Sequence, residues 1–340
     1  MGSKNYRLLI FLGLIAFVWN GCKPDEDVVP DTFTGAKVLI ANQGNFGWGE
    51  GTLSVYYEES KTVDGEVYKA KNQESLGNVF HSIASFNGLY FFVINNSGKI
   101  VVTDSSYGKI KEITGLTSPR NIYKVTEDKA YITDLYSGAI YILDLNSLEV
   151  TGTIPCNGHT EEGIFREGLF WFAAPETANI YAVDVVTDRI TDSLTVGWMP
   201  ERMVLDNEKI LWVLNRGDES KNESAKLTSV SITDLDITTT AFELSAVPAS
   251  LAYDSKSNVV YFLSDGIWRL RLGQDEVPQS WMQVPDAEFY DVAVHPASGD
   301  VYVSDVKDFV SKSTIYRYSQ GGTLLDEFSA GIIAGDFFFP

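Results

Sequence analysis

The sequence has 340 residues, of which 44% are hydrophobic and 13% aromatic, so it can fill one large domain or two ordinary ones and is not a disordered chain. Its formal charge of -20 and pI of about 4.5 repel phosphate backbones, which argues against nucleic acid as a partner. Of its two cysteines, Cys22 falls in the targeting region described next, so we expect no disulfide in the mature domain and interpret Cys156 as a packing residue.

The N-terminus has the pattern of an export signal. Lys4 and Arg7 precede an apolar run over residues 8–19, which is too short for a membrane span, and the small residue Gly21 stands directly before Cys22. A cysteine in this position resembles the lipobox of bacterial lipoproteins, in which the cysteine is acylated.

We therefore expect residues 1–21 to be a signal peptide and Cys22 to be lipidated. Residues 22–35 are polar with two prolines, so we expect them to tether the domain at residues 36–340 to a membrane. The alternative is an ordinary cleaved signal with an incidental cysteine.

Seven apolar segments recur along the rest of the chain, at intervals close to the roughly 40–45 residues of a β-propeller blade. Each is followed by a polar loop and by strands that alternate apolar and polar residues, and no stretch after residue 35 has a helical period. The seven segments are 38–42, 91–95, 130–134, 170–174, 211–215, 260–264 and 301–305. We predict an all-β fold, a seven-bladed β-propeller, with these segments as the second strand of each blade counted outward from the axis.

The first repeat lacks a first strand, because residues 38–42 follow the tether directly. Residues 329–340 at the C-terminus resemble residues 115–125, which read as a connection followed by a first strand. We predict that the C-terminal strand inserts into the N-terminal blade and so closes the ring.

The second residue of the seven recurring strands is nearly always aromatic. The column is Leu39, Phe92, Tyr131, Trp171, Trp212, Tyr261 and Tyr302. We interpret it as packing between neighbouring blades, and the alternative is a stack of rings that binds a ligand.

The two ends of the predicted propeller differ. One end carries the connections from second to third strands and from each fourth strand to the next blade, and we call it the long-loop face; the other end has short turns. Aromatic and polar residues on loops of a rigid scaffold are typical of a small-molecule site. The candidate ligand-binding residues on the long-loop face are Asn45, Phe46, Trp48, Phe80, His81, Asn95, Asn96, Arg120, Tyr136, Glu162, Trp198, Arg202, Arg216, Tyr290 and Asp291.

The stretch ANQGNFGWGEG, residues 41–51, is one of these loops. Its glycines allow tight turns, and it contains two large rings, Phe46 and Trp48. Either both rings are displayed to solvent or both fold down to cap the first blade.

Catalytic and metal-binding motifs are not found. The chain has three histidines and no HxH, HExxH, CxxC, GxSxG or P-loop spacing, so we expect no catalytic residues, no cofactor and no histidine-rich metal site. Glu161, Glu162 and Glu201 are either acids for proton transfer or, as we expect, solvated side chains, and Glu161 and Glu162 point opposite ways on a strand. Glu161, Glu201 and Asp291 lie near the starts of first strands, so an axial calcium ion stays open as an alternative. The RGD triplet at residues 216–218 is attributed to chance.

The blade sequence AYITDLYSGAIYILDLNSLEVTGTIPCNG resembles the YVTN-type propeller repeat. Together with the lipoprotein start, VLIANQGNFGWGEGTLSVY and the terminal AGIIAGDFFF, it resembles the YncE-like, DUF5074-type seven-bladed surface lipoproteins of Bacteroidetes over nearly all of residues 36–340. Some members of that group capture vitamin B12 at the cell surface and pass it to a TonB-dependent outer-membrane transporter.

The resemblance implies an exported protein, held on the outer membrane at the cell surface by its lipid anchor alone. It implies a non-enzymatic function, the capture of cobalamin or a related corrinoid for a TonB-dependent transporter. Two alternatives stay open, a protein-interaction or adhesion propeller and a propeller enzyme of the lactonase or lyase type.

Overall fold

The computed structural model describes residue 2 and residues 37–232, 240–243, 247–275 and 277–340. The predicted lipidation site, Cys22, and the tether over residues 22–35 lie outside these residues. In the described residues, no helix is long and apolar enough to cross a membrane.

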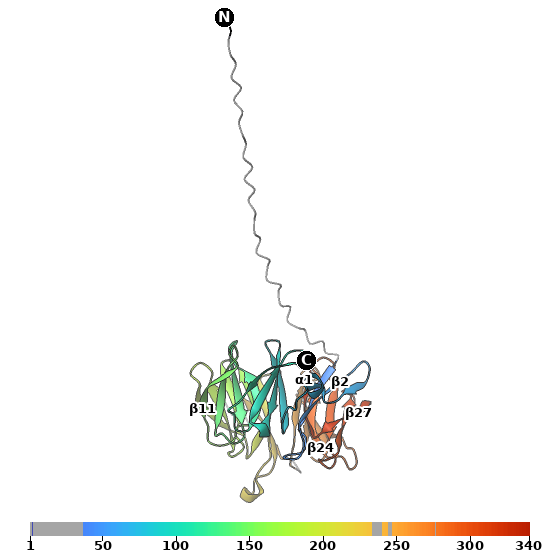
Figure 1. The fold of residues 1–340 in the computed structure, drawn as a ribbon. Helices are drawn as coiled ribbons and strands as arrows, with labels where there is room; N and C mark the ends of the chain where they lie inside the picture. The colour runs from blue at the N-terminus through green and yellow to red at the C-terminus, as the bar shows by residue number, and fades with distance from the viewer. Residues whose placement is uncertain (1, 3–36, 233–239, 244–246, 276) are drawn as a thin grey trace. The chain divides into compact units, whose positions relative to one another are not determined.

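The described strands form seven sheets of four antiparallel strands, as the repeats predict (Figure 1). From the innermost strand outward, blade 1 is β28 (Ala334–Phe338), β1 (Lys37–Asn42), β2 (Thr52–Tyr57) and β3 (Thr62–Asp64). Blade 2 is β4 (Phe80–Phe86), β5 (Leu89–Ile94), β6 (Lys99–Thr103) and β7 (Lys109–Ile113). Blade 3 is β8 (Pro119–Lys124), β9 (Lys129–Asp134), β10 (Ala139–Asp144) and β11 (Glu149–Pro155).

Blade 4 is β12 (Gly163–Arg166), β13 (Leu169–Ala173), β14 (Asn179–Asp184) and β15 (Arg189–Thr195). Blade 5 is β16 (Pro200–Leu205), β17 (Ile210–Asn215), β18 (Lys226–Ser231) and β19 (Thr240–Glu243). Blade 6 is β20 (Leu251–Asp254), β21 (Val259–Leu263), β22 (Ile267–Arg271) and β23 (Gln279–Met282). Blade 7 is β24 (Phe289–Val294), β25 (Val301–Asp305), β26 (Lys312–Tyr318) and β27 (Leu324–Ile332).

The first strands of the blades line the axis of the propeller. Each of them contacts the first strand of the next blade, from β4 through β8, β12, β16, β20 and β24 to β28 and back to β4. The predicted order of strands and the closed ring are therefore confirmed.

The ring closes where the two ends of the chain meet. β28 pairs antiparallel with β1, with Leu39 opposite Phe338 and Ile40 opposite Phe337. In Figure 1, β2 (blue) lies beside β27 (red), and the two strands are in contact. The predicted C-terminal closing strand is confirmed, and the pairing leaves no free inner edge on β1.

The core consists of apolar clusters between neighbouring blades. Seven such clusters occur in the described residues, one at each interface between blades, including the interface of blades 7 and 1. The aromatic column lies within them, and its members are at most 8% exposed. The interpretation of the column as packing between blades is confirmed.

One short helix has no sign in the sequence pattern. The chain has a short helix, α1 (Val67–Asn72), between β3 and β4, and it buries Tyr68 against blades 1 and 2. Six residues make fewer than two helical turns, which is too short to produce a recognisable period in the sequence. Two single turns of 3-10 helix, η1 (Asn95–Ser97) and η2 (Glu219–Lys221), lie in connections on the long-loop face.

Candidate functional site

The loop between β1 and β2 displays its two rings. The side chain of Trp48 is 94% exposed and that of Phe46 is 70% exposed. The displayed arrangement is therefore confirmed, and the alternative in which the rings cap blade 1 is wrong. An indole this exposed gains nothing from burial in the free protein, so its place on the surface requires another explanation.

The backbone of this loop is held by a residue that the sequence analysis did not select, Asn78. Its amide nitrogen donates to the carbonyl oxygens of Asn45 (3.3 Å) and Gly49 (2.5 Å), and its amide oxygen accepts from the backbone N–H of Gly47 (3.1 Å). Gly47 has a φ of 74°, a conformation that side chains disfavour. The loop is thus ordered by hydrogen bonds, while the rings it carries stay outside the core.

The axial end of the long-loop face is shaped by β-bulges. In five blades of the described structure, the register shifts at the start of the first strand. The residues within the shifts are His81, Arg120, Asn121, Glu201, Tyr290 and Gly335. A bulge re-aims side chains and is often found beside a functional site, so the same local irregularity places several candidate residues at one end of the axis.

All three candidate arginines form ion pairs with glutamates on this face. Arg120 Nε donates to Glu161 Oε2 at 2.7 Å, and Arg202 Nη1 donates to Glu162 Oε1 at 2.6 Å. Arg216 Nη1 lies 3.2 Å from Glu201 Oε1. The two adjacent glutamates thus meet arginines of the blades on either side, β8 and β16, which agrees with their pointing opposite ways.

The expectation that these acids are solvated is wrong. Glu161 is 8% exposed, and Glu162 is half-buried and also accepts the backbone N–H of Met203 at 2.8 Å. Fixed by arginines and backbone, these carboxylates hold the first strands of blades 3, 4 and 5 together around the axis. A buried charge of this kind is stable only when it is paired.

His81 belongs to the same group of residues. Its Nδ1 lies 3.3 Å from Arg120 Nη1, which can only donate, so Nδ1 accepts. Burial, together with the positive charge of Arg120, holds the pKa of His81 well below its usual range. The imidazole is therefore neutral at pH 7.

Two buried carboxyl groups lie on the neighbouring first strands β24 and β28. Asp291 accepts a hydrogen bond from the hydroxyl of Ser250 at 2.6 Å. Burial raises the pKa of Asp291 to about 7. Asp336 accepts the backbone N–H of Ile83 at 2.8 Å, and burial, followed by the charge of Asp291, raises its pKa to about 8. Sequence reasoning treated residues 329–340 only as the closing strand and missed Asp336. The alignment of YDVAV with GDFFF, in which the two aspartates correspond, could have indicated it.

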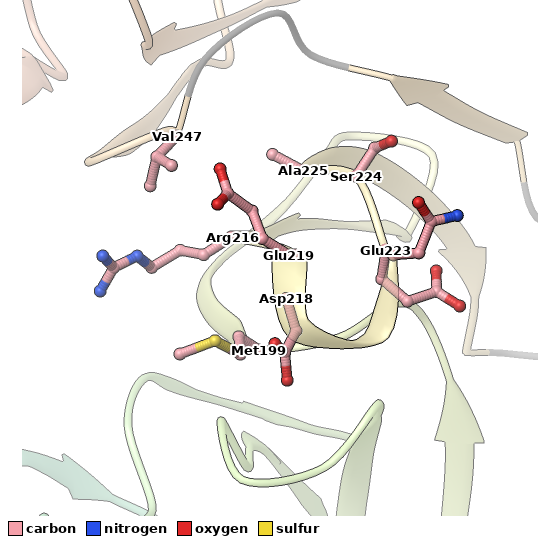
Figure 2. A pocket seen from close by; sticks show the side chains of 10 residues that line it. Met199, Arg216, Asp218, Glu219, Glu223, Ser224, Ala225 and Val247 are labelled. Carbon is pink, nitrogen blue, oxygen red and sulfur yellow. The ribbon is translucent and has the colours of Figure 1, made fainter.

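The connection between β17 and β18 projects furthest from the blades in Figure 1, as the yellow loop that carries η2. A cavity of about 460 Å³ lies beside it (Figure 2), lined among others by Met199, Arg216, Glu219 and Val247. The neighbouring Trp198 is half-buried, with Lys221 Nζ 4.3 Å from the centre of its ring. Within the RGD triplet, Asp218 bonds Ser220 and Lys221 of its own loop, which gives the triplet a local structural role.

Four predicted site residues are buried: besides His81 (5% exposed) and Asp291 (6% exposed), Phe80 and Asn95 belong to the interior instead of the surface. Phe80 is completely buried in the cluster between blades 1 and 2, because it starts a first strand and points into the blade. Asn95 is 7% exposed and donates to the carbonyl oxygen of Pro119 at 3.0 Å, which joins blades 2 and 3. Neither side chain is open to a ligand at the surface.

The remaining candidates lie on the long-loop face. Asn96 is exposed and donates to Asn78 Oδ1 at 2.7 Å, beside the displayed loop. Tyr136 is 67% exposed and meets His159 edge-on, with 5.5 Å between ring centres. Tyr290 is half-buried, bonds Gln43 through its hydroxyl at 3.3 Å and meets the exposed ring of Phe309 edge-on. Through Gln43 and Asn78, the contacts of Tyr290 and Asn96 link the loops of blades 7, 1 and 2.

The described residues contain no group of three or more His, Cys, Asp or Glu side chains placed to hold a metal ion. Along the axis the acids face arginines, as for Glu162 and Arg202, or accept neutral donors. The chemistry that this face offers is therefore apolar contact from exposed rings and hydrogen bonding from fixed polar groups.

Comparison with solved structures reveals the same fold in distant proteins. A quinonprotein alcohol dehydrogenase-like protein from Bacteroides thetaiotaomicron is 16% identical, with a TM-score of 0.71 over 90% of this chain and 78% of that one. Hydrazine synthase from Kuenenia stuttgartiensis is 14% identical, with a TM-score of 0.64 over 90% and 99% of the two chains. The dihydro-heme d1 dehydrogenase NirN is 8% identical, with a TM-score of 0.61 over 89% and 75%. At these identities the likeness concerns the fold alone.

A search of curated proteins finds no match. One family model matches residues 36–340, the whole of the predicted propeller domain, and its description is "Domain of unknown function (DUF5074)". The chain is a seven-bladed β-propeller and belongs to the DUF5074 family.

Proposed function

We propose that this protein is a non-enzymatic ligand-binding propeller that captures a small molecule on its long-loop face. The observation that carries the proposal is the exposed pair Phe46 and Trp48 on a loop fixed by Asn78. A ring that is held in place before the ligand arrives loses little conformational entropy on binding, so its apolar contact contributes fully to affinity.

The ligand class that suits this surface has a broad apolar face and a polar rim. Phe46 and Trp48 would cover the face, and Asn96, which bonds Asn78 beside their loop, would bond the rim. A corrinoid such as cobalamin has this form, and the resemblance to surface lipoproteins favours it.

The same proposal includes the place of action. The signal-like start and Cys22 favour a lipid-anchored protein on the outer membrane at the cell surface, and a TonB-dependent transporter is the partner that would receive the ligand. The acidic composition, with a net charge of -20, suits a soluble domain facing water.

The test is calorimetric titration of the full chain with cyanocobalamin. We expect one ligand per chain, and we expect Trp48→Ala to weaken binding by about tenfold or more, since burying a large ring contributes about 1.5–3 kcal/mol. Val186→Ala is the matched control, because Val186 is also exposed, at 85%, but lies in the turn between β14 and β15 on the opposite face. Absence of heat, together with no co-elution of the ligand on a sizing column, would exclude cobalamin.

A second candidate function is protein interaction through the same face. It is favoured by two further exposed apolar side chains near Tyr290, Phe309 at 42% and Val310 at 60%, which extend the apolar surface beyond the displayed loop. If cobalamin does not bind, protein interaction becomes the leading hypothesis. A surface of this kind would then be buried against a partner over an area typical of protein interfaces.

A further inference from the structure

A second cavity lies where blade 7 meets blade 1, and we call it the seam pocket. Its volume is about 410 Å³, within the range of roughly 300–1,000 Å³ typical of small-molecule sites. Its walls come from β2, β3 and α1 on one side and from β26 and β27 on the other, with Gly44 and Gly49 of the displayed loop at its edge. The pocket therefore exists only while the ring is closed.

The floor of the seam pocket offers hydrogen-bond donors. The Asn42 amide nitrogen donates to Ser54 Oγ (2.9 Å) and to the carbonyl oxygen of Thr52 (2.9 Å), and it shares a hydrogen with Thr52 Oγ1 (3.2 Å). Its amide oxygen accepts from the backbone N–H of Gly331 (2.9 Å). Each hydroxyl accepts one bond in this way, which leaves its own hydrogen to be donated to a bound group. Asn42 also fixes the two walls at this point, since Gly331 belongs to β27.

The rim of the seam pocket carries both signs of charge, from Glu50, Glu66, Lys69 and Lys312. Lys69 and Glu50 are 3.7 Å apart, and both side chains are more than half exposed, so their pairing is weak and can be exchanged for another partner. Lys312 forms no ion pair with any described residue. The pocket is thus lined by two cations and two anions that do not neutralise each other fully.

This balance selects among ligands. A simple anion is repelled by the overall charge of -20, and a simple cation meets two lysines at the entrance. A molecule that carries both charges complements both halves of the rim, and complementary charge favours one partner over its singly charged relatives.

We propose that the seam pocket binds a small zwitterion with one carboxylate and one ammonium group, of the amino acid or short peptide class. The carboxylate bonds the hydroxyls of Ser54 and Thr52 and the ammonium group of Lys312. The ammonium group of the ligand lies against Glu50 and Glu66. The rings of Phe46 and Trp48 do not line this pocket, although Gly44, Gly49 and Glu50 of their loop do, so the inference does not require those rings to bind a ligand. An occupant would also stabilise the closed ring, because it contacts the first and the last blade together.

The experiment is calorimetry and thermal unfolding of the full chain with L-alanyl-L-alanine as the probe. N-acetyl-L-alanyl-L-alanine, which lacks the ammonium group, and L-alanyl-L-alaninamide, which lacks the carboxylate, are the matched comparisons. We expect one dipeptide to bind per chain and to raise the melting temperature, and we expect each singly charged analogue to bind at least tenfold more weakly. Equal binding of either analogue, or no heat with the dipeptide, overturns the proposal.

Variants locate the site. Lys312→Ala removes an exposed side chain, so the fold should be kept, and we expect at least tenfold weaker binding of the dipeptide. Glu66→Gln should weaken it in the same direction through the other end of the ligand. Lys71→Ala is the control, because Lys71 is an exposed lysine close in sequence to Lys69 that does not line the pocket. Unchanged binding in Lys312→Ala and Glu66→Gln, with unchanged melting temperatures without ligand, also overturns the proposal.

Discussion

Two tryptophans in this propeller have opposite environments. Trp171, in β13, is 1% exposed and packs with Met203 and Leu211 between blades 4 and 5. Trp48 is 94% exposed on the loop between β1 and β2. The two residues have the same side chain, so the difference comes from the backbone that presents it.

The second strand of each blade lies between two sheets, and its inward residues have no route to water. The loop of Trp48 is instead satisfied by its own hydrogen bonds to Asn78 and needs no apolar contact to be ordered. Rings in the strands therefore stabilise the scaffold, and rings in the loop are available for function. The predictions below test this division, from the largest expected effect to the smallest.

Deletion of residues 335–340 should have the largest effect. It removes nearly all of β28, including Phe337, which packs against Tyr302 of blade 7, and it leaves the inner edge of β1 unpaired. We expect loss of cooperative unfolding, or a loss of stability of more than about 4–5 kcal/mol, measured by urea denaturation. Deletion of Pro340 alone is the control. A truncated chain that melts like the full chain would show that the seam does not hold the ring closed.

Trp171→Ala should come next. Truncation of a buried indole leaves a cavity between blades 4 and 5, and we expect the free energy of unfolding to fall by about 3–5 kcal/mol. Trp171→Phe should lower the free energy of unfolding less than Trp171→Ala does, because the phenyl ring still fills part of the space between blades 4 and 5. A loss below 1 kcal/mol for the alanine variant would mean that the aromatic column does not carry the packing between blades.

The free energy of unfolding should depend on pH, because two buried aspartates, Asp291 and Asp336, lie beside the axis. The folded-state pKa values of Asp291, about 7, and Asp336, about 8, lie above the value of about 3.9 for an unfolded aspartate. The folded state therefore holds these protons more tightly, and the stability they contribute is complete below about pH 4 and is lost as the pH rises through 7 to 8. His81, whose pKa is lowered, acts in the opposite direction, but only below the unfolded histidine value of about 6.5.

The window from pH 6.5 to 8.5 thus isolates the two acids. We expect the free energy of unfolding to fall across it by on the order of 1–3 kcal/mol. Asp291→Asn keeps an acceptor for the hydroxyl of Ser250 and cannot ionise, so it should remove about a third of the fall directly and reduce it further by lowering the pKa of Asp336. Glu162 and Arg202, which also face Asp291, stay unchanged. If the free energy of unfolding changed with pH equally in the natural protein and in Asp291→Asn, Asp291 would not titrate in this window.

The fold could be predicted from the sequence because it repeats. Seven copies of one strand pattern give the number of blades, and a first repeat without a first strand, such as residues 38–42, requires a strand from elsewhere. The displayed loop could be located for the same reason, since the repeat places it on the long-loop face. The sequence could not decide whether Phe46 and Trp48 are displayed or fold onto blade 1. The hydrogen bonds that order their loop come from Asn78, which is distant in the sequence.

The axial site was harder to predict. A β-bulge at the start of β4 breaks the simple alternation of strand residues, so Phe80 was expected on the surface and lies in the interior. Asn95, in the turn η1 after β5, is buried by its bond to Pro119 of the next blade. The pairing of Arg120 with Glu161 joins residues of different blades, and no spacing along one strand encodes it. Asp336 was missed because the closing strand was considered only for its backbone.

The smallest effect on stability should come from Trp48→Ala. A side chain that is 94% exposed loses almost no contact when it is truncated, so we expect the free energy of unfolding to stay within about 0.5 kcal/mol of the natural protein. Subtracting the emission of this variant from that of the natural protein isolates one of the seven tryptophans, and this difference spectrum should be quenched readily by acrylamide. Asn78→Ala should leave Trp48 exposed but free its loop, and should weaken ligand binding without the loss of a ring. Protection of the difference spectrum from acrylamide in the free protein, or a stability loss in Trp48→Ala close to that of Trp171→Ala, would mean that the ring is part of the core and that the loop is a cap on blade 1.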